Sequence, residues 1–376
     1  MKRKIKNSEI GLIEELKIIK KIISDCLKDV KETAKRGRKP FYKIEDIIFF
    51  LILKIEFKLS YRQLRRLGFD FYEKVPVISN LYYRFKQIDE EIINKILLKI
   101  SEEILKKIKF KQDKVIAVVD GTGFGYNCPY YQRTNRGAEI RKIKSHLKVV
   151  YILFVKGRKR IIRCVGVGGA YEDERKILLS KGLLKKIKKR KGARKGYLLF
   201  GDKLYGMSKE VIKESIRQGY IPIFKVEDGM HNKVRDELRL WVKRIYESNK
   251  ELYKGKRFHI EGKNGNIKIR YESYEECKVY EIARSFVLVK FLLYTLYEYI
   301  KTGGGIKNFL FFYFLLNFNK IYFKKGILEQ PYSYFIILLK LGIMKFISLH
   351  LENCFVEENV ELGAEVQIHI GLFREK

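Results

Sequence analysis

Val115-Ile116-Ala117-Val118-Val119-Asp120 is a short apolar run that ends at an aspartate, and Tyr197-Leu198-Leu199-Phe200-Gly201-Asp202 repeats this pattern later in the chain. Runs of this kind predict buried β-strands. If the two strands lie side by side and parallel, their carboxylates converge at one edge of the sheet. A carboxylate held there suits the binding of a hard divalent cation.

A third acidic residue, Glu261, completes the candidate site. It lies in the pattern Arg257-x3-Glu261-x6-Lys268, whose offsets of i, i+4 and i+11 keep all three residues on one face of a helix. Three carboxylates in one place repel each other unless a cation neutralises them. Two divalent metal ions about 4 Å apart would neutralise the three carboxylates. They would also activate a nucleophile and stabilise the leaving oxygen of a phosphodiester. Asp120, Asp202 and Glu261 are therefore the candidate catalytic and metal-binding residues.

The charge of the chain favours a polyanion as its partner. With 80 Lys and Arg against 44 Asp and Glu, the 376 residues carry a net charge of +36. A hydrophobic content of 46% is typical of a folded protein and excludes a disordered basic tail as the source of this charge. Nucleic acid is favoured over an acidic membrane surface, and a general role in solubility is the remaining alternative.

The sequence predicts a soluble protein of the cytoplasm that associates with the nucleoid. Its five cysteines form no C-x-x-C pair, so they indicate neither a zinc site nor a disulfide framework. The basic N-terminus leads into no apolar signal-peptide region. The apolar stretch around residues 309–318 is shorter than the roughly 20 residues that a membrane span needs.

Residues 1–110 are predicted to be a helical DNA-binding region. Leu12, Leu16, Ile19 and Ile23 recur at helical spacing, with lysines opposite. The linker Lys35-Arg36-Gly37-Arg38-Lys39-Pro40 resembles short peptides that lay Arg-Gly-Arg into the minor groove of AT-rich DNA. Arg36 and Arg38 are therefore candidate DNA contacts, although an ordinary solvated linker fits the same residues.

Two short helices within this region fit a helix-turn-helix. Ser60 and Gln63 form a capping box for a helix over residues 61–67 that stops at Gly68, and Ser79 is expected to cap a helix over residues 80–88. In the second helix the apolar residues share one face, which leaves polar groups for bases and phosphates on the other. A plain helical bundle is the alternative. The candidate DNA-binding residues here are Asn80, Tyr83, Arg84 and Gln87.

The middle of the chain, residues 111–302, predicts an α/β domain with a mixed sheet and flanking helices. Strands are expected at 114–120, 146–155, 160–168, 197–202 and 221–226, and helices at 172–189, 207–218 and 256–300. Gly303-Gly304-Gly305 marks the boundary to a third region, 303–376, which is rich in aromatic residues and carries no motif. We assign no chemical role to this tail.

Taken together, the motifs resemble the DDE transposases of bacterial and archaeal insertion sequences. The matching segments are Val118-Val119-Asp120-Gly121-Thr122, Gly201-Asp202-Lys203-Leu204-Tyr205-Gly206 and Arg257-x3-Glu261-x6-Lys268. One branch of that family carries Tyr-x2-Arg-x3-Glu-x6-Lys around its catalytic glutamate. Tyr253 lies one residue too far upstream for this signature, while its Arg, Glu and Lys match. The resemblance covers about residues 40–300.

The resemblance implies a ribonuclease H-like, integrase-type catalytic domain preceded by an all-α, helix-turn-helix-like region. It implies that Asp120, Asp202 and Glu261 bind two Mg²⁺ or Mn²⁺ ions for the cleavage of double-stranded DNA at terminal inverted repeats and for strand transfer into target DNA. Arg257 and Lys268 would hold the DNA end. Bringing two ends together implies a homodimer on DNA. Tyr205 fits either stacking on a displaced base or packing in the core.

Other readings of the same residues stay open. A non-catalytic DNA-binding remnant or repurposed copy of a transposase would keep the charge and the helices without the chemistry. A ribonuclease on the same fold would share the acidic triad, and Glu261 with Lys268 also fits a solvated helix face. Gly121-x-Gly123-x-Gly125 lacks the glycine spacing of a dinucleotide site and the Gly-Lys-Ser/Thr of a P-loop, so it predicts no phosphate-binding loop.

Overall fold

The computed structural model of the chain describes residues 7–29, 41–108, 116–133, 140–157, 159–187, 196–228 and 234–302. The side chains of residues 7–15, 129–133, 140–144, 256–261, 263 and 264 lie outside this description, although their backbone is included. Arg36, Arg38 and the whole of region 303–376 also fall outside it. None of the helices in the described ranges has the length and apolar character needed to cross a membrane.

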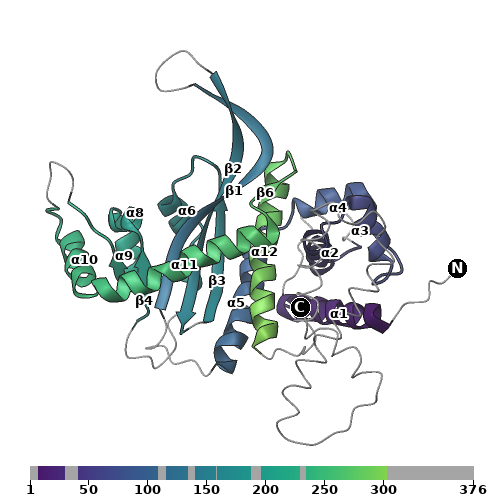
Figure 1. Cartoon of the computed structure of the whole chain (residues 1–376), viewed down its shortest axis with the longest axis horizontal. Helices are drawn as coiled ribbons and strands as arrows, with labels where there is room; N and C mark the ends of the chain where they lie inside the picture. The colour runs from purple at the N-terminus through teal and green to yellow at the C-terminus, as the bar shows by residue number, and fades with distance from the viewer. Residues whose placement is uncertain are drawn as a thin grey trace, which may run out of the picture. The chain divides into compact units, whose positions relative to one another are not determined.

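The described strands form one mixed six-stranded sheet (Figure 1). Its strand order is β3-β2-β1-β4-β5, and a short strand, β6, also pairs with β1. β1 with β2 and β2 with β3 are antiparallel, whereas β1 with β4 and β4 with β5 are parallel. The strands are β1 (Ile116–Arg133), β2 (Ile140–Lys156), β3 (Lys159–Gly168), β4 (Leu198–Gly201), β5 (Ile221–Phe224) and β6 (Tyr274–Glu275).

Helices precede the sheet and flank it. This mixed sheet with flanking helices is consistent with the ribonuclease H-like fold that the sequence predicts. The helices are α1 (Asn7–Leu27), α2 (Ile44–Glu56), α3 (Tyr61–Gly68), α4 (Ile78–Phe85), α5 (Glu90–Lys107), α6 (Glu174–Ser180), α7 (Leu183–Lys186), α8 (Lys203–Gly206), α9 (Lys209–Arg217), α10 (Glu237–Ser248), α11 (Lys250–Tyr271) and α12 (Tyr280–Lys301).

The helix α5 joins the N-terminal helices to the sheet. Its buried Asn94 side chain donates to the Val165 carbonyl and accepts from the Val165 backbone N–H, both at 2.8 Å. Because β3 is at the edge of the sheet, these bonds satisfy backbone groups that no neighbouring strand reaches. On α12, the buried Ser285 hydroxyl donates to the Phe85 carbonyl at 2.6 Å, at the end of α4. The described helices before residue 108 therefore share their core with the sheet.

The two short helices of the N-terminal region differ in part from prediction. Ser60 caps α3 with a capping box to Gln63, as expected. However, α4 begins at Ile78, two residues before the predicted start, and Val77 is its N-cap, so Ser79 lies inside the helix. Residues 69–77 connect α3 to α4, a longer connection than the turn of about three or four residues in a helix-turn-helix.

Two predicted helices in the middle of the chain have wrong boundaries, and one helix was not predicted. The predicted helix 172–189 is broken into α6 and α7, because Gly182 adopts a left-handed conformation with φ of 58° between them. The helix predicted to begin near residue 256 begins at Lys250 and ends at Tyr271, and β6 separates it from α12. α10 was not predicted; among its described residues only Val242 is buried, which leaves a weak apolar pattern.

Candidate active site

The two aspartates lie at the same level on neighbouring parallel strands. The register of β1 and β4 pairs Ile116 with Leu198 and Val118 with Phe200. Continued by two residues, the same register brings Asp120 level with Asp202. The prediction that the strands carrying these residues are parallel neighbours is therefore confirmed.

One part of that prediction was wrong, because Asp120 does not end its strand. β1 continues to Arg133, and Asp120 pairs with Tyr151 within the long antiparallel ladder to β2. Gly121, Gly123 and Gly125 are extended residues of this ladder, which agrees with the absence of a phosphate-binding loop there. Asp120 is half-buried at the level where β4 stops, so β4 alone ends at the site.

Asp202 also has a structural role. It is the N-cap of α8, and its side-chain carboxylate accepts hydrogen bonds from the backbone N–H of Leu204 at 2.9 Å and of Tyr205 at 3.4 Å. These bonds fix the orientation of the carboxylate at the end of β4. A substitution at this position therefore affects both the local fold and the charge of the site.

Glu174 is a further acidic residue near Asp202, and the sequence did not predict it. Because it lies where the side chain of Gly121 would point, it is on the face of β1 opposite to Asp120. It is the first residue of α6, and its carboxylate lies against Gly121, where an added Cβ would be 2.2 Å from Oε2. The Tyr205 hydroxyl donates to Oε2 at 3.4 Å. Burial raises the pKa of Glu174, the charge of Asp202 raises it further, and Lys148 opposes both. Acidic residues are common in a first helical turn, so the sequence carries no signal that singles Glu174 out.

Tyr205 lies next to Glu174 and Asp202, since its hydroxyl bonds to Glu174 and its backbone N–H bonds to Asp202. Its side chain is fully buried and its ring centroid lies 6.2 Å from that of Phe224. Burial holds the pKa of the Tyr205 phenol well above its ordinary value, and the charges of Glu174, Asp120 and Asp202 add to this effect. All three carboxylates therefore lie near one phenol. Of the two roles considered for Tyr205, packing in the core is the one that the structure supports.

The helix α11 crosses the strands that carry the aspartates (Figure 1). Near its start, the buried Tyr253 hydroxyl donates to the Gly201 carbonyl at 3.1 Å, one residue before Asp202. Towards its end, the Lys268 ammonium lies 5.8 Å from the centre of the Phe124 ring on β1. Asp120 and Phe124 are separated by four residues of a regular ladder, so both belong to one face of the sheet. The helix thus runs across the face of β1 that contains Asp120.

Arg257, Glu261 and Lys268 all lie in α11, so their spacing does place them on one helical face. The side chains of Arg257 and Glu261 are outside the described part of the structure. Their predicted roles as DNA contact and catalytic residue stay predictions, as does the role of Lys268.

The donor chemistry of the two aspartates suits Mg²⁺ or Mn²⁺, because both ions prefer carboxylate oxygens. Within the described ranges, however, no three His, Cys, Asp or Glu side chains are arranged to hold a metal ion. A centre that includes Asp120 and Asp202 therefore needs a ligand beyond this set.

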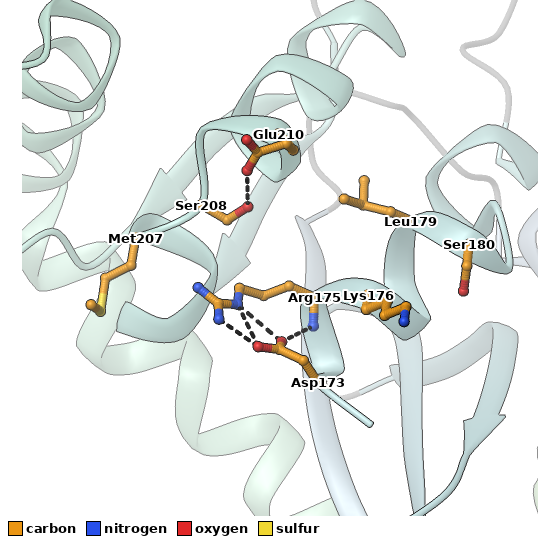
Figure 2. A pocket seen from close by; sticks show the side chains of 8 residues that line it. All are labelled: Asp173, Arg175, Lys176, Leu179, Ser180, Met207, Ser208 and Glu210. Atoms are coloured by element: carbon orange, nitrogen blue, oxygen red, sulfur yellow. Dashed lines mark hydrogen bonds and ion pairs between the residues drawn. The ribbon is translucent and has the colours of Figure 1, made fainter. Parts of the chain in front are cut away.

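An open cavity of about 550 Å³ lies beside the site, between the start of α6 and the connection from α8 to α9 (Figure 2). Within it, the Arg175 guanidinium pairs with Asp173, and the Ser208 hydroxyl donates to Glu210 at 2.9 Å. Because the lining contains both positive and negative side chains, and Arg175 is paired with Asp173, the cavity has no uniform positive or negative charge. Its lining residues are Asp173, Arg175, Lys176, Leu179, Ser180, Met207, Ser208 and Glu210.

The predicted DNA-binding residues around α4 differ in their surroundings. Leu81, Phe85 and Ile88 are buried, which confirms the predicted apolar face. Tyr83 is 62% exposed, and the Arg84 guanidinium donates to the Tyr42 carbonyl at 3.1 Å. The remaining two candidates are Asn80, which is half-buried, and Gln87, which is exposed in the turn after α4.

No protein-family profile matches this chain. An uncharacterized protein of Aquifex aeolicus (strain VF5) is 34% identical to it over 267 residues, which cover 71% of this chain and 81% of the relative. The chain belongs to the same family as this Aquifex aeolicus protein.

Among solved structures, the Drosophila P element transposase strand transfer complex aligns with a TM-score of 0.22 and 15% identity. The aligned part covers 55% of this chain and 42% of that chain, so it spans less than half the length of the P element protein.

Proposed function

We propose that this protein is a DDE-type transposase of an insertion sequence, which cuts double-stranded DNA at the ends of its element and joins those ends to target DNA. The observation that carries the proposal is the common level of Asp120 and Asp202 on neighbouring parallel strands. The crossing of that face by α11, which contains Glu261, supports it. The net charge of +36 supports a nucleic acid as the substrate.

Each carboxylate has a defined place in the proposed mechanism. Asp120, Asp202 and Glu261 are the residues that would hold two Mg²⁺ or Mn²⁺ ions, which activate a nucleophile and stabilise the leaving oxygen of a phosphodiester when bound. Leu204 and Tyr205 hold Asp202 in one orientation through its cap bonds. The buried Tyr205 ring packs next to Phe224 and anchors the short helix α8, which Asp202 caps.

The cations of α11 would position the substrate. Arg257 and Lys268 share a helical face with Glu261, so a phosphate bound by either lies beside the proposed metal ligands. Contacts of this kind fix the register of DNA and carry little sequence information. Sequence recognition of the terminal repeats would fall to the exposed polar groups around α4, which include Tyr83 and Gln87. Synapsis of two ends would require two copies of the chain.

The test is Mg²⁺-dependent cleavage of DNA that carries the terminal repeats flanking the gene. Asp120→Asn, Asp202→Asn and Glu261→Gln should each abolish cleavage while the protein still binds DNA. Lys213→Gln is a matched control, because Lys213 is an exposed residue of α9. Cleavage that survives in one of the three variants removes that residue from the site. Binding of the repeats without cleavage by the wild-type protein identifies a non-catalytic DNA-binding protein instead.

A further inference from the structure

Lys290 is a buried cation in α12, where it lies between the buried residues Val289 and Phe291. It is 2% exposed, and its ammonium pairs with the carboxylate of Glu275 on β6, which is 7% exposed. The same ammonium donates to the Glu272 carbonyl at 3.0 Å. Replacing a buried ion pair with apolar residues of similar volume often leaves stability unchanged or raises it. The stability of the core alone therefore does not account for a lysine at this position.

The carbonyl that Lys290 contacts belongs to a residue with an unusual backbone conformation. Glu272 directly follows α11 and has φ of 65° and ψ of 149°, a combination that residues other than glycine rarely adopt. Such a conformation persists only where the surrounding contacts fix it. The side chain of Glu272 also pairs with Lys58, which follows α2. The end of α11 is therefore a backbone position that Lys290 and Lys58 both stabilise.

The segment that follows Glu272 lies directly against β1. The Gly125 N–H donates to the Ser273 carbonyl at 2.8 Å, and β6 then pairs in parallel with β1. An added Cβ at Gly125 would lie 2.9 Å from the Tyr274 ring, so the glycine permits this close approach. Because Lys290 contacts residues 272 and 275, it joins the end of α11 to β1. We call these contacts of Lys290 the C-terminal anchor of α11.

The C-terminal anchor lies on the face of β1 that carries Asp120. The Lys290 ammonium is 5.6 Å from the centre of the Phe124 ring, and the ammonium of Lys268, near the end of α11, is 5.8 Å from it. The ring of Phe291, the residue after Lys290, lies 6.0 Å from the same ring. Asp120 and Phe124 are four residues apart in a regular part of the ladder, so their side chains share one face of the sheet.

The helix α11 is thus held at both ends. Its N-terminal anchor is the bond from the Tyr253 hydroxyl to the Gly201 carbonyl at the end of β4. Glu261 lies between the two anchors, eight residues after Tyr253 and eleven before Glu272. At a rise of about 1.5 Å per residue Glu261 is about 16 Å from the C-terminal anchor, so a tilt of about 5° would move it by about 1.4 Å. A misplacement of about 1 Å can lower the rate of an enzyme about 100-fold.

We propose that Lys290 is a positioning residue, which holds the end of α11 at one level of β1 and so sets where Glu261 lies along that strand. The proposal rests on the proposed function for its effect on DNA cleavage, but not for the anchoring of α11 itself. A pair that only stabilised the fold would affect stability and cleavage alike. A positioning residue affects the rate of cleavage at saturating DNA, while stability and DNA affinity remain.

The test compares two double variants that each remove a buried cation and its acidic partner. Lys290→Met/Glu275→Leu removes the C-terminal anchor without leaving an unpaired charge. Arg163→Met/Glu102→Gln is the matched control, because Arg163 on β3 is 4% exposed and both its partners, Glu102 and Ser101, are on α5.

The anchor variant should cleave DNA about 10–100-fold more slowly than the wild type at saturating DNA. Its stability in urea and its affinity for a duplex carrying one element end should stay at the wild-type level. The amide hydrogens of residues 266–277 should exchange faster with solvent, whereas those of β4 and β5 should not. The control should cleave at the wild-type rate.

Gly125→Ala disturbs the same anchor from the side of β1, and it decides the question if the double variant does not fold. Its Cβ would press on the Tyr274 ring, so it should also slow cleavage at unchanged DNA affinity. Gly123→Ala is its control, because the nearest atoms would lie 3.9 Å from the added Cβ. Wild-type cleavage in the anchor variants, an equal loss in their controls, or a loss of cleavage matched by a loss of stability overturns the proposal.

Amide exchange separates this proposal from the proposed function. If the wild-type protein does not cleave DNA, the proposed function fails and exchange alone decides on the anchor. Faster exchange of residues 266–277 in the anchor variants then supports the anchoring of α11 by Lys290, and unchanged exchange overturns it. If the wild type cleaves and the anchor variants cleave equally fast, only the role of Lys290 fails.

Discussion

Replacing Asp202 with asparagine or with alanine separates its role as the N-cap of α8 from its proposed role as a metal ligand. The carboxylate accepts from the N–H groups of Leu204 and Tyr205 at 2.9 and 3.4 Å, and it also belongs to the acidic site. Asparagine is about as good an N-cap as aspartate, whereas alanine costs about 0.5–2 kcal/mol. We therefore expect Asp202→Ala to lower the free energy of unfolding by about 1 kcal/mol.

The asparagine variant should be at least as stable as the wild type when no divalent metal is present. Asp202 lies near Glu174 and raises its pKa, so removal of the Asp202 charge relieves repulsion between carboxylates. Both variants should nevertheless lose DNA cleavage, because neither retains the charge that would hold a metal ion.

Urea unfolding with and without Mg²⁺ measures both effects together. A ligand present at 100 times its dissociation constant stabilises the folded protein by about 2.7 kcal/mol, so Mg²⁺ should stabilise the wild type by an amount of this order. Both Asp202 variants should lose that response. If Asp202→Asn keeps its response to Mg²⁺ or its cleavage activity, the metal-binding role is wrong. If Asp202→Ala is as stable as Asp202→Asn, the cap contributes nothing.

Three further outcomes follow from the same contacts. Gly121→Ala should lower the free energy of unfolding by about 1–3 kcal/mol in urea, because its Cβ would be 2.2 Å from Glu174, whereas Gly123→Ala should cost much less. Tyr253→Phe removes the bond to the Gly201 carbonyl, so it should cost about 1 kcal/mol and slow cleavage while DNA affinity stays unchanged. Alkylation by iodoacetamide at pH 8 should be slow for three cysteines and should rise steeply only towards higher pH or in denaturant, because burial raises their thiol pKa values to about 11 for Cys26 and about 12 for Cys164 and Cys277.

Much of the sheet could be predicted from the sequence because buried strands read as runs of Val, Ile and Leu. The run that ends at Asp120 was predicted to end the strand as well. Glycines at 121, 123 and 125 and Pro129, which follow it, are unfavourable in strands. Pairing with β2 overrides this preference and carries β1 on to Arg133. Cross-strand pairing of this kind is a property of two segments together, so a single stretch does not reveal it.

Contacts with other segments, which a single stretch of sequence does not reveal, also explain the boundaries of α11. Gly262 and Gly265 lower the intrinsic preference of this segment for a helix, yet the helix runs through both of them. Tyr253, Ile267 and Tyr271 are buried on it, so packing against the rest of the protein stabilises it. Glu174 could not be predicted at all, because its place against Gly121 depends on how α6 packs on the sheet.

The part of the site that the sequence did predict depends on strand register. Asp120 is level with Asp202 because Val118 pairs with Phe200, and all the residues from Ala117 to Val119 are buried. A slip of one residue would move the side chain of Asp120 to the opposite face of the sheet and would exchange the packing partners of those apolar residues. The burial that stabilises β1 therefore also fixes the level of its aspartate. Asp120 directly follows an apolar segment of β1, so the energetics of the core, rather than of the site, determine where its carboxylate lies.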